Sequence, residues 1–415
     1  MRIEAAFVVL AVLARQALAT PLFGQCGGTD FTGATACVAG STCTASNENY
    51  SHYNADVADI ANRAPAAATG FVRASGTGFT LNGKPFFFGG TNALSSTDLN
   101  SLFSQMNSAG LHVLRIFAWS DVVGSSSDAL QTWSGSTNTP NAAAFAKHMD
   151  PIVNAAVANN IRLVVPMIGN WGPSISLYIQ QIVGSSGTHD TFYSNAKIVA
   201  AYKKYISFFV NRYKTSPGIF AWELMNEPRC TGDDNRGASS ACNTALITNW
   251  AKQISSYIKS LDSNHMVTMG DEGWFTAADG FGSTYPYQGG EGIDWTNNLK
   301  ISTIDYGTIH LYPGSWGQTT SWGNTWISQH MTKAKSINKP VVLEEFGTAS
   351  SGRQAVVQGW LNTALSSGFA GFQYWQFVAS FPSGYKSPDD GNGISTSEAT
   401  FSTVKSAAAS MNAKN

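Results

Sequence analysis

Short apolar stretches alternate with segments of helical periodicity along most of the chain. The apolar stretches are of strand length, are rich in β-branched and aromatic residues, and are bounded by glycine or polar residues. The eight expected strands are 86–90, 113–118, 163–168, 219–224, 266–269, 306–309, 341–345 and 371–375. Amphipathic segments such as 142–159, 196–213 and 244–261 lie between them. Eight strand–helix units within residues 70–415 predict an α/β fold, a (β/α)8 TIM barrel.

A β-hairpin is expected immediately before the first of these strands. Asn82-Gly83 separates two short strand-like runs, and this dipeptide favours the tight turn of a two-residue hairpin. Such a hairpin would form the floor of the barrel.

Polar, ionisable and aromatic residues follow most of the expected strands. They are Arg115, Asn170, Trp171, Asn226, Glu227, Arg229, Asp271, Glu272, Trp274, His310, Tyr312, Trp316, Glu345 and Trp375. The active site of a barrel lies at the C-terminal ends of its strands, so these side chains should meet there. A purely structural rim would need none of them, and the sequence therefore predicts an active site.

Two strand ends carry a glutamate in the same kind of context. The stretch 220–230 begins as an apolar strand and breaks at Pro228, which leaves Glu227 at the end of the strand. The stretch 339–347 carries Glu345 in a similar position. Glycoside hydrolysis needs one carboxylic acid to protonate the leaving oxygen and a second carboxylate to attack or to activate water. The pair therefore indicates displacement at the anomeric carbon of a sugar.

The two glutamates are expected to have different roles. Glu227 is the expected acid, with a pKa raised by burial beside an apolar wall. Glu345 is the expected nucleophile, kept ionised by Arg115 and by a hydroxyl such as that of Tyr312. Adjacent strand residues point to opposite faces, so only one of Glu344 and Glu345 should face the barrel centre. Periodicity does not choose between them, and Glu223 poses the same question in its own strand.

The composition favours a neutral, ring-shaped ligand. Charged residues make up only 12%, the net charge is −1, and the chain has 12 Trp, 14 Tyr and 23 Phe, although most of these aromatics must be core. A nucleic-acid partner would need a basic surface, which this balance excludes. Asn226 is placed to bind a sugar 2-hydroxyl, and Trp375 offers an apolar face to a sugar ring.

No metal ion or other cofactor is expected. The seven histidines are scattered without the spacing of metal ligands, and no glycine-rich loop followed by lysine suggests a nucleotide. No membrane partner is expected either, and the chain is expected to be a monomer.

The first 19 residues have the pattern of a signal peptide. Arg2 provides a basic start, residues 5–13 an apolar run, and Ala17-Leu18-Ala19 a cleavage site. The apolar run is too short to span a bilayer. A secreted, extracellular protein from an oxidising compartment is therefore expected.

Residues 20–53 form a short segment rich in glycine and cysteine, and residues 54–69 read as a linker. The segment resembles a fungal family 1 carbohydrate-binding module. The resemblance implies a disulfide between Cys26 and Cys43 and an aromatic strip that retains Phe23 and Tyr50. The copy is degenerate: Tyr53 stands at the fourth cysteine position, which leaves Cys37 without a partner. Asn49 replaces the middle aromatic and begins a glycosylation sequon, so a decayed module is favoured over one that still binds polysaccharide.

The rest of the chain, residues 70–411, resembles a fungal endo-β-1,4-mannanase of glycoside hydrolase family 5, within clan A. The matching stretches are Val113-Leu114-Arg115, Trp222-Glu223-Leu224-Met225-Asn226-Glu227-Pro228-Arg229-Cys230, Ser260-Leu261-Asp262-Ser263-Asn264-His265, Gly270-Asp271-Glu272-Gly273, His310-Leu311-Tyr312-Pro313, Glu344-Glu345-Phe346-Gly347 and Phe372-Gln373-Tyr374-Trp375-Gln376. The Asn-Glu-Pro motif marks the broad clan, whereas its extension by Arg-Cys and the His-Leu-Tyr-Pro motif point to mannanases.

This resemblance implies a retaining enzyme that cuts internal β-1,4-mannosidic bonds of plant cell-wall mannan, glucomannan and galactomannan. It makes Glu227 the acid/base and Glu345, not Glu344, the nucleophile. It places further residues on active-site positions, namely Arg115, Asn226, His310, Tyr312 and Trp375. It also places Trp171 and Arg229 along the substrate cleft, with Arg229 on the leaving-group side. Cys230 and Cys242 are expected to close a loop at the edge of the cleft.

Departures from the family pattern keep two alternatives open. The loop at 91–95 is shorter than usual and lacks a Tyr-Trp pair, the loop after Trp171 is also short, and Met225 replaces a small residue. A β-1,4-glucanase or a transglycosylase on the same barrel is therefore an alternative. A non-catalytic polysaccharide-binding protein is the other, although it would be expected to lack one of the glutamates or Arg115.

Overall fold

The computed structural model describes residues 25–27, 41–47, 50–55, 70–93, 98–381, 387 and 389–415. The chain divides into two units, Met1–Ala67 and Ala68–Asn415. In the first unit, β1 (Gln25–Gly27), β3 (Tyr50–Ala55) and β2 (Ser41–Asn47) form an antiparallel sheet in that order. The signal peptide, residues 56–69 of the linker, Phe23, Cys37 and the side chains of Cys26, Cys43 and Tyr50 lie outside the described residues. The first two residues of the expected linker, 54 and 55, belong to β3 instead.

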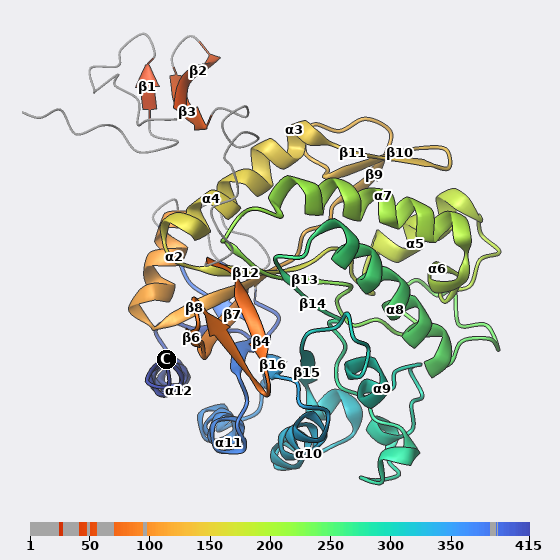
Figure 1. The fold of residues 1–415 in the computed structure, drawn as a ribbon, viewed down its shortest axis with the longest axis vertical. Coiled ribbons are helices and arrows are strands. Elements are labelled where there is room, and N and C mark those ends of the chain that lie inside the picture. Colours follow the sequence, from red (N-terminus) through yellow and green to blue (C-terminus); the bar gives the residue numbers. More distant parts are fainter. Residues whose placement is uncertain are drawn as a thin grey trace, which may run out of the picture. The chain divides into compact units, whose positions relative to one another are not determined.

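Eight parallel strands form the centre of the second unit, with helices around their outer side (Figure 1). The strands are β7 (Phe88–Ala93), β8 (Leu111–Ile116), β12 (Arg162–Pro166), β13 (Ile219–Glu223), β14 (Met266–Thr268), β15 (Gly307–Leu311), β16 (Val341–Phe346) and β17 (Gly371–Tyr374). Their order is β14-β13-β12-β8-β7-β17-β16-β15. Hydrogen bonds connect the two ends of this sheet, for example from Thr268 Oγ1 of β14 to the carbonyl oxygen of Tyr306, the residue before β15, at 3.0 Å. The expected TIM barrel is confirmed.

Helices follow the strands and cover the barrel. They are α2 (Leu99–Ser108), α3 (Ala142–Ala144), α4 (Asp150–Ala158), α5 (Pro173–Ile182), α6 (Thr191–Ser194), α7 (Ala196–Tyr213), α8 (Thr244–Leu261), α9 (Trp295–Leu299), α10 (Trp322–Ile337), α11 (Arg353–Ser367) and α12 (Ala399–Asn412). Asparagine side chains cap α7 and α8: Asn195 accepts from the Lys197 and Ile198 amides, and Asn243 accepts from that of Leu246. Such caps satisfy amides that have no partner within the helix, which explains why these two helices begin where the sequence predicts.

Short strands lie outside the barrel sheet. The expected hairpin is present as β5 (Gly78–Leu81) and β6 (Lys84–Pro85), joined at Asn82-Gly83 and extended by β4 (Val72–Ser75). The other short strands are β9 (Asp121–Val123), β10 (Gln131–Ser134), β11 (Thr137–Pro140), β18 (Phe377–Val378) and β19 (Ile394–Ser395). Phe79 of the hairpin packs inside the barrel, with its ring centroid 5.2 Å from that of Phe220 and 5.4 Å from that of Tyr306. The hairpin therefore closes the end of the barrel opposite the predicted site.

Several element boundaries differ by one or two residues from the expectations, and two elements differ in a way that packing or local geometry explains. The first strand was expected at 86–90 but spans Phe88–Ala93. Its Gly89-Gly90 pair looks like a strand end in the sequence, yet a Cβ at Gly89 would come within 2.7 Å of the Ala408 Cβ of α12. Close packing therefore requires glycine at these positions, and the apolar pattern of the sequence does not predict this packing. The segment expected as one helix at 142–159 is interrupted by a π-helical turn at Phe145–Met149.

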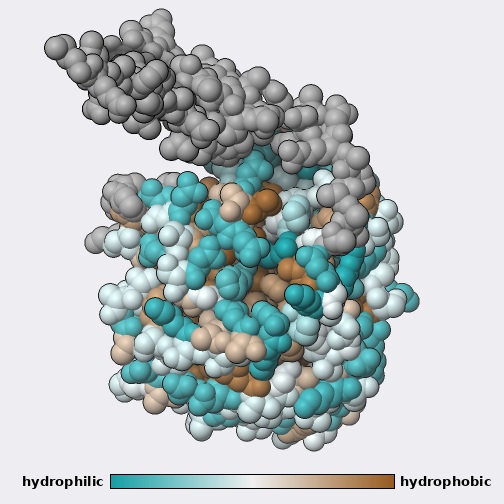
Figure 2. Space-filling model, turned by 60° about the vertical axis from the view of Figure 1, so that its left-hand side comes forward, coloured by the Kyte–Doolittle hydropathy of each residue, from teal (hydrophilic) through white to brown (hydrophobic). Residues whose placement is uncertain are grey.

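The face drawn in Figure 2 is mixed in character. Hydrophobic residues appear there as small areas between hydrophilic and intermediate ones. Within the described ranges, no helix has the length and apolarity needed to cross a membrane. Among the residues that the structure describes, four large hydrophobic side chains are exposed, namely Val123, Val157, Trp171 and Tyr285. Trp171 is a predicted cleft residue.

Candidate active site

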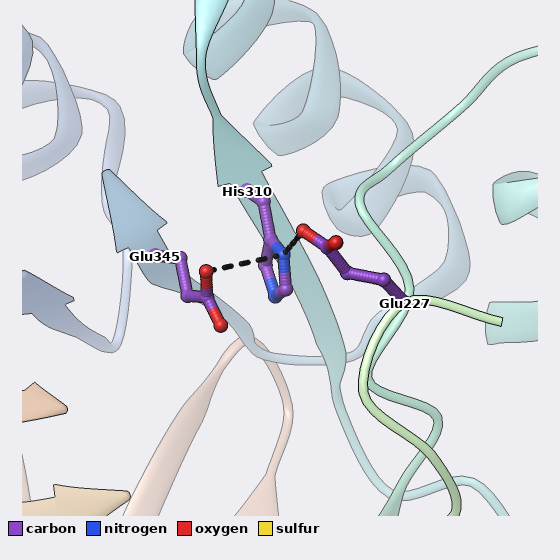
Figure 3. A group of neighbouring side chains, drawn as sticks. All are labelled: Glu227, His310 and Glu345. Carbon is purple, nitrogen blue, oxygen red and sulfur yellow. Dashed lines mark hydrogen bonds and ion pairs between the residues drawn. The ribbon is translucent and has the colours of Figure 1, made fainter. Parts of the chain in front are cut away.

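Glu227, His310 and Glu345 meet at the C-terminal ends of the barrel strands, with the imidazole ring between the two carboxylates (Figure 3). His310 Nδ1 lies 2.6 Å from Glu227 Oε1 and 3.7 Å from Glu345 Oε2. Both carboxylates have an oxygen within a group of atoms that all lie within 4.8 Å of one another. The residues are buried, with 8% of Glu227 and 4% of Glu345 exposed. The predicted pair is therefore brought together in space.

The backbone at Glu227 has an unusual conformation. Its φ is 53°, in the left-handed region that residues other than glycine seldom adopt. The amide of Glu227 donates to the carbonyl oxygen of Gly270 at 2.8 Å. Gly270 has a φ of 83°, and a Cβ at this position would collide with the Met225 carbonyl oxygen and the Glu223 carboxylate. The absence of a side chain at Gly270 thus allows the neighbouring loops to approach and hold Glu227.

Arg115, at the end of β8, connects several of these strand ends. Its Nε donates to Glu223 Oε2 at 2.8 Å, and its Nη2 donates to Asn226 Oδ1 at 2.7 Å. Its Nη1 donates to Glu345 Oε1 and, at 3.2 Å, to Asn92 Oδ1. The guanidinium therefore orients Asn226 and Glu345 together, as a planar group with five N–H donors can.

Glu344 departs from the expected alternation. The pairing of β15 with β16 shifts between Ile309 and His310, so that Ile309 faces Leu343 while His310 faces Glu345. This β-bulge leaves Glu344 as the extra residue and breaks the two-residue period. Glu344 Oε2 lies 3.7 Å from Arg115 Nε and 3.5 Å from His310 Nε2. Glu344 and Glu345 both contact Arg115 and His310, and these four residues together with Glu223 and Glu227 are called the central cluster below. The expectation that only one of the two glutamates faces the barrel centre was therefore wrong.

Tyr312 and Trp171 contact the two carboxylates directly. The Tyr312 hydroxyl donates to Glu345 Oε2 at 2.9 Å, as predicted. Trp171 Nε1 donates to Glu227 Oε2. Trp171 is 37% exposed, so it also presents a surface to solvent beside the acid. The guanidinium of Arg229 lies 5.1 Å from the Trp171 ring centroid, within the range of a cation–π contact.

Arg229 is held by an ion pair. Its Nε and Nη2 each lie 2.7 Å from an oxygen of Glu272. Its guanidinium also lies 5.3 Å from the ring centroid of Trp274, which in turn lies 5.3 Å from that of Trp316. The loops after β13, β14 and β15 thus form one continuous aromatic and charged wall.

The loop after Arg229 carries a disulfide between Cys230 and Cys242. This pair was expected and is confirmed. The amide of Cys230 donates to the Glu291 carbonyl oxygen at 2.9 Å. The disulfide and this hydrogen bond together restrain the segment that presents Arg229.

Trp375 follows β17 and is half-buried. Its ring centroid lies 5.6 Å from that of Phe117, and its Nε1 donates to Asp390 Oδ2 at 2.9 Å. Phe117, Asp390 and Asn92 were not predicted as site residues. The alternating pattern along β7 and β8 could have indicated Asn92 and Phe117. Asp390 lies in an irregular loop, and the position of such a loop cannot be predicted from sequence periodicity.

Two other predicted rim residues have contacts within the fold. The side-chain oxygen of Asn170 lies 2.8 Å from His189 Nε2, and its amide donates to the Thr231 carbonyl oxygen at 3.1 Å. Asp271 accepts from Asn298 Nδ2 at 3.1 Å, and burial raises its pKa to about 7. Both side chains therefore hold loops together behind the central cluster.

The pKa values of Glu227 and Glu345 are shifted in the opposite directions to those expected. Burial would raise the pKa of Glu227, but the hydrogen bond and charge of His310, with Arg229 and Trp171, lower it to about 2. Burial raises the pKa of Glu345 above its ordinary value despite the attraction of His310 and Arg115. His310 itself has a raised pKa: burial opposes its charge, but Glu345, Glu227 and Glu344 favour it more strongly. Burial also raises the pKa of Glu223, to about 8.

Glu227, His310 and Glu345 are also the kinds of side chain that bind divalent metal ions. Their donor atoms already have partners: His310 Nδ1 contacts Glu227, and the oxygens of Glu345 contact Arg115 and Tyr312.

A barrel that holds a pair of buried carboxylates at its strand ends has the architecture of a glycoside hydrolase. Residues 72–380 match the family described as cellulase, glycosyl hydrolase family 5, and the chain belongs to this family. Residues 22–50 match the fungal cellulose-binding domain. The protein is therefore a glycoside hydrolase with a matching binding-module sequence at its N-terminal side.

Several characterised proteins are similar over most of the chain. Mannan endo-1,4-beta-mannosidase A of Aspergillus aculeatus is 40% identical over 338 residues, which cover 79% of this chain and 86% of that protein. Mannan endo-1,4-beta-mannosidase F of Aspergillus fumigatus is 35% identical over 409 residues, with coverage of 89% and 90%. The crystal structure of the endo-1,4-beta-mannanase from Rhizomucor miehei has a TM-score of 0.75 and 36% identity, and covers 83% of this chain and 99% of that one.

Gly270→Ala should destabilise the fold and reduce activity, because the new Cβ would separate the loops that hold Glu227. Gly280→Ala is the matched control, since Gly280 also has a positive φ, of 75°, but nothing within 4 Å of its Cβ position. Thermal unfolding followed by circular dichroism should show an additional loss for Gly270→Ala of about 1–3 kcal/mol, the usual cost of overpacking. Equal losses in the two variants would contradict the close-packing account.

Arg115→Met should reduce the free energy of unfolding by about 3–5 kcal/mol at neutral pH, because it leaves buried carboxylates without their cation. Arg353→Met is the control, since Arg353 pairs with one partly exposed glutamate, Glu398, and should cost only about 0–1 kcal/mol. Without Arg115, the folded-state pKa values of its carboxylate partners rise further. The loss in free energy of unfolding relative to the wild type should therefore become larger as pH increases from 5 to 8. Urea unfolding at both pH values measures this, and a deficit independent of pH would contradict it.

Proposed function

We propose that this chain is a retaining endo-β-1,4-mannanase that hydrolyses internal β-1,4-mannosidic bonds in mannan, glucomannan and galactomannan. The observation that carries the proposal is the short separation of Glu227 and Glu345, which have oxygens within 4.8 Å of each other across His310. Retaining glycosidases place their carboxyl groups about 5–5.5 Å apart, whereas inverting ones leave about 6.5–9.5 Å for a water. The substrate assignment is supported by the mannanases to which the chain is similar.

In the first step, Glu345 attacks the anomeric carbon while Glu227 protonates the glycosidic oxygen. The bond from the anomeric carbon to the leaving sugar breaks as the bond to Glu345 forms, which gives a glycosyl-enzyme. In the second step, Glu227 removes a proton from water, and the water oxygen displaces Glu345. The proton count is restored, and the anomeric configuration is retained after two inversions.

The neighbouring residues support these steps in different ways. Arg115 and Tyr312 orient Glu345 through the hydrogen bonds of Nη1 and of the hydroxyl group. Asn226, oriented by Arg115, binds the 2-hydroxyl of the reacting sugar, and Trp375 packs against its ring. Trp171 and Arg229 bind sugars on the leaving-group side, because Trp171 contacts Glu227 and is exposed.

The remaining assignments extend the proposal to the whole chain. Residues 1–19 act as a signal peptide for secretion, 20–53 form a degenerate carbohydrate-binding module, 54–69 a linker and 70–415 the catalytic barrel. The chain acts as a monomer on plant cell-wall β-mannans. The match of residues 22–50 to the fungal cellulose-binding domain supports the assignment of this segment as a carbohydrate-binding module by origin.

Reducing-sugar release should be measured from galactomannan, glucomannan and carboxymethylcellulose with the full chain. The expected result is release from both mannans, lost by at least about 10³-fold in Glu345→Ala, the scale seen when a covalent nucleophile is removed. Glu398→Ala is the control, because Glu398 pairs with Arg353 away from the central cluster and should leave activity unchanged. Release mainly from carboxymethylcellulose would make the chain a β-1,4-glucanase instead, and no release from any substrate would favour a binding protein.

A further inference from the structure

His310 is surrounded by carboxylates on both edges of its ring. Nδ1 faces Glu227 at 2.6 Å and Glu345 at 3.7 Å, and Nε2 faces Glu344 at 3.5 Å. The imidazole is fully buried, so water does not compete for either nitrogen. A neutral imidazole has only one N–H, whereas imidazolium donates from both nitrogens. The geometry therefore favours a ring protonated on both sides.

Glu344 has no step of its own in the hydrolysis. It is fully buried, and its Oε1 has no hydrogen-bond partner among the described residues. Its Oε2 approaches Arg115 Nε only to 3.7 Å, whereas Glu223 contacts that same nitrogen at 2.8 Å. Burial of a carboxylate with incomplete hydrogen bonding is unfavourable. The contact that distinguishes Glu344 from the other carboxylates is the one with His310 Nε2.

Other charged and titratable groups act on His310 or on its carboxylate partners. They are Arg115 from β8, Glu223 from β13, Glu227 and Arg229 from the loop after β13, Asp271 and Glu272 from the loop after β14, Tyr312 from the end of β15, and Glu344 and Glu345 from β16. Arg115 and Arg229 are paired with Glu223 and Glu272 respectively. Carboxyl groups therefore outnumber guanidinium groups around the ring, and Glu344 is the member of this set that contacts Nε2.

We propose that Glu344 is a positioning residue that keeps His310 protonated on both nitrogens, and that His310 thereby holds the proton that Glu227 delivers to the glycosidic oxygen. In the first step, the proton passes from His310 Nδ1 to the Glu227 carboxylate and from there to the leaving oxygen, which leaves His310 neutral. In the second step, the proton that Glu227 takes from water returns to His310. This inference rests on the proposed roles of Glu227 and Glu345.

The proposal accounts for the lowered pKa of Glu227. An isolated general acid should hold its own proton near neutral pH, yet the pKa of this carboxyl is about 2, because His310 donates to it. A proton shared along the 2.6 Å contact between Nδ1 and Oε1 can reside on the ring and still reach the substrate through Glu227. Loss of the negative charge at Glu344 would lower the pKa of His310, so the shared proton would be lost at lower pH.

The test is the pH profile of kcat/KM on mannohexaose for Glu344→Gln, with Glu344→Asp and Glu398→Gln alongside. Glu344→Gln should move the alkaline limb to lower pH by about 1–3 units, the shift expected when a charge within hydrogen-bond distance is removed. Glu344→Asp, which keeps the charge, should restore part of the shift. Glu398→Gln should leave the limb in place. A loss of activity in Glu344→Gln and Glu344→Asp with no movement of the limb would mean that Glu344 is only structural, and would overturn the proposal.

A substrate whose leaving group needs no protonation separates the effect of Glu344 on the proton donor from its other effects on catalysis. With 2,4-dinitrophenyl β-mannobioside, whose leaving group departs without protonation, Glu344→Gln should lose less of its first-step rate than with mannohexaose and should keep the wild-type alkaline limb. The same limb shift with both leaving groups would contradict a proton-holding role. If the wild-type chain acted on neither substrate, the proposed function would fail instead, which distinguishes the two failures.

The unmodified protein offers a second readout that does not depend on the folding of a variant. NMR of the chain labelled with 15N-histidine, with the His310 signals assigned by their loss in His310→Gln, reports the protonation of each ring nitrogen. Both His310 nitrogens should carry protons at pH 7. A bare Nδ1 or Nε2 at that pH would overturn the proposal.

Discussion

The central interaction of the structure is the set of contacts around the Arg115 guanidinium. This fully buried cation holds four side chains from the ends of three strands: Asn92 of β7, Glu223 and Asn226 at the end of β13, and Glu345 of β16. Because the guanidinium is planar and its N–H groups diverge, each partner is held in a defined direction. The position of the expected nucleophile and that of the sugar-binding amide are therefore set by one residue from a third strand.

Around this cation, burial and charge act against each other. Burial alone would protonate the central carboxylates and deprotonate His310. The opposite charges reverse this for His310 and Glu227, whose pKa values move apart, while burial prevails at Glu345 and Glu223. Protonation in this cluster is therefore a property of the whole group, and a role cannot be assigned to one carboxyl from its own environment.

Much of the fold could be predicted from the sequence because its signals are local. Buried strands and amphipathic helices have their own periodicities, and α7 and α8 begin at asparagine caps that the chain itself provides. The candidate site was predicted for a similar reason: Glu227, His310 and Glu345 each lie at or just beyond the C-terminal end of a recognisable strand. The disulfide between Cys230 and Cys242 was also expected, from the family resemblance and the secreted context.

What could not be predicted depends on contacts between distant segments. The bulge in β16 that turns Glu344 toward His310 results from the pairing with β15. The alternation of residues along a single strand does not predict it. Gly89 reads as a strand end until the packing of α12 against it is known. The pKa order of Glu227 and Glu345 was wrong because it depends on the ring of His310, which lies between them only in the folded chain.

The most direct test of the central claim is the anomeric configuration of the first product released from mannohexaose, followed by 1H NMR within the first minutes of reaction. The separation of Glu227 and Glu345, with oxygens within 4.8 Å of each other, leaves no room for a water between nucleophile and sugar. The β-anomer should therefore accumulate first and convert to the α-anomer by mutarotation. Initial accumulation of the α-anomer would show inversion and would contradict the assignment of Glu345 as a covalent nucleophile.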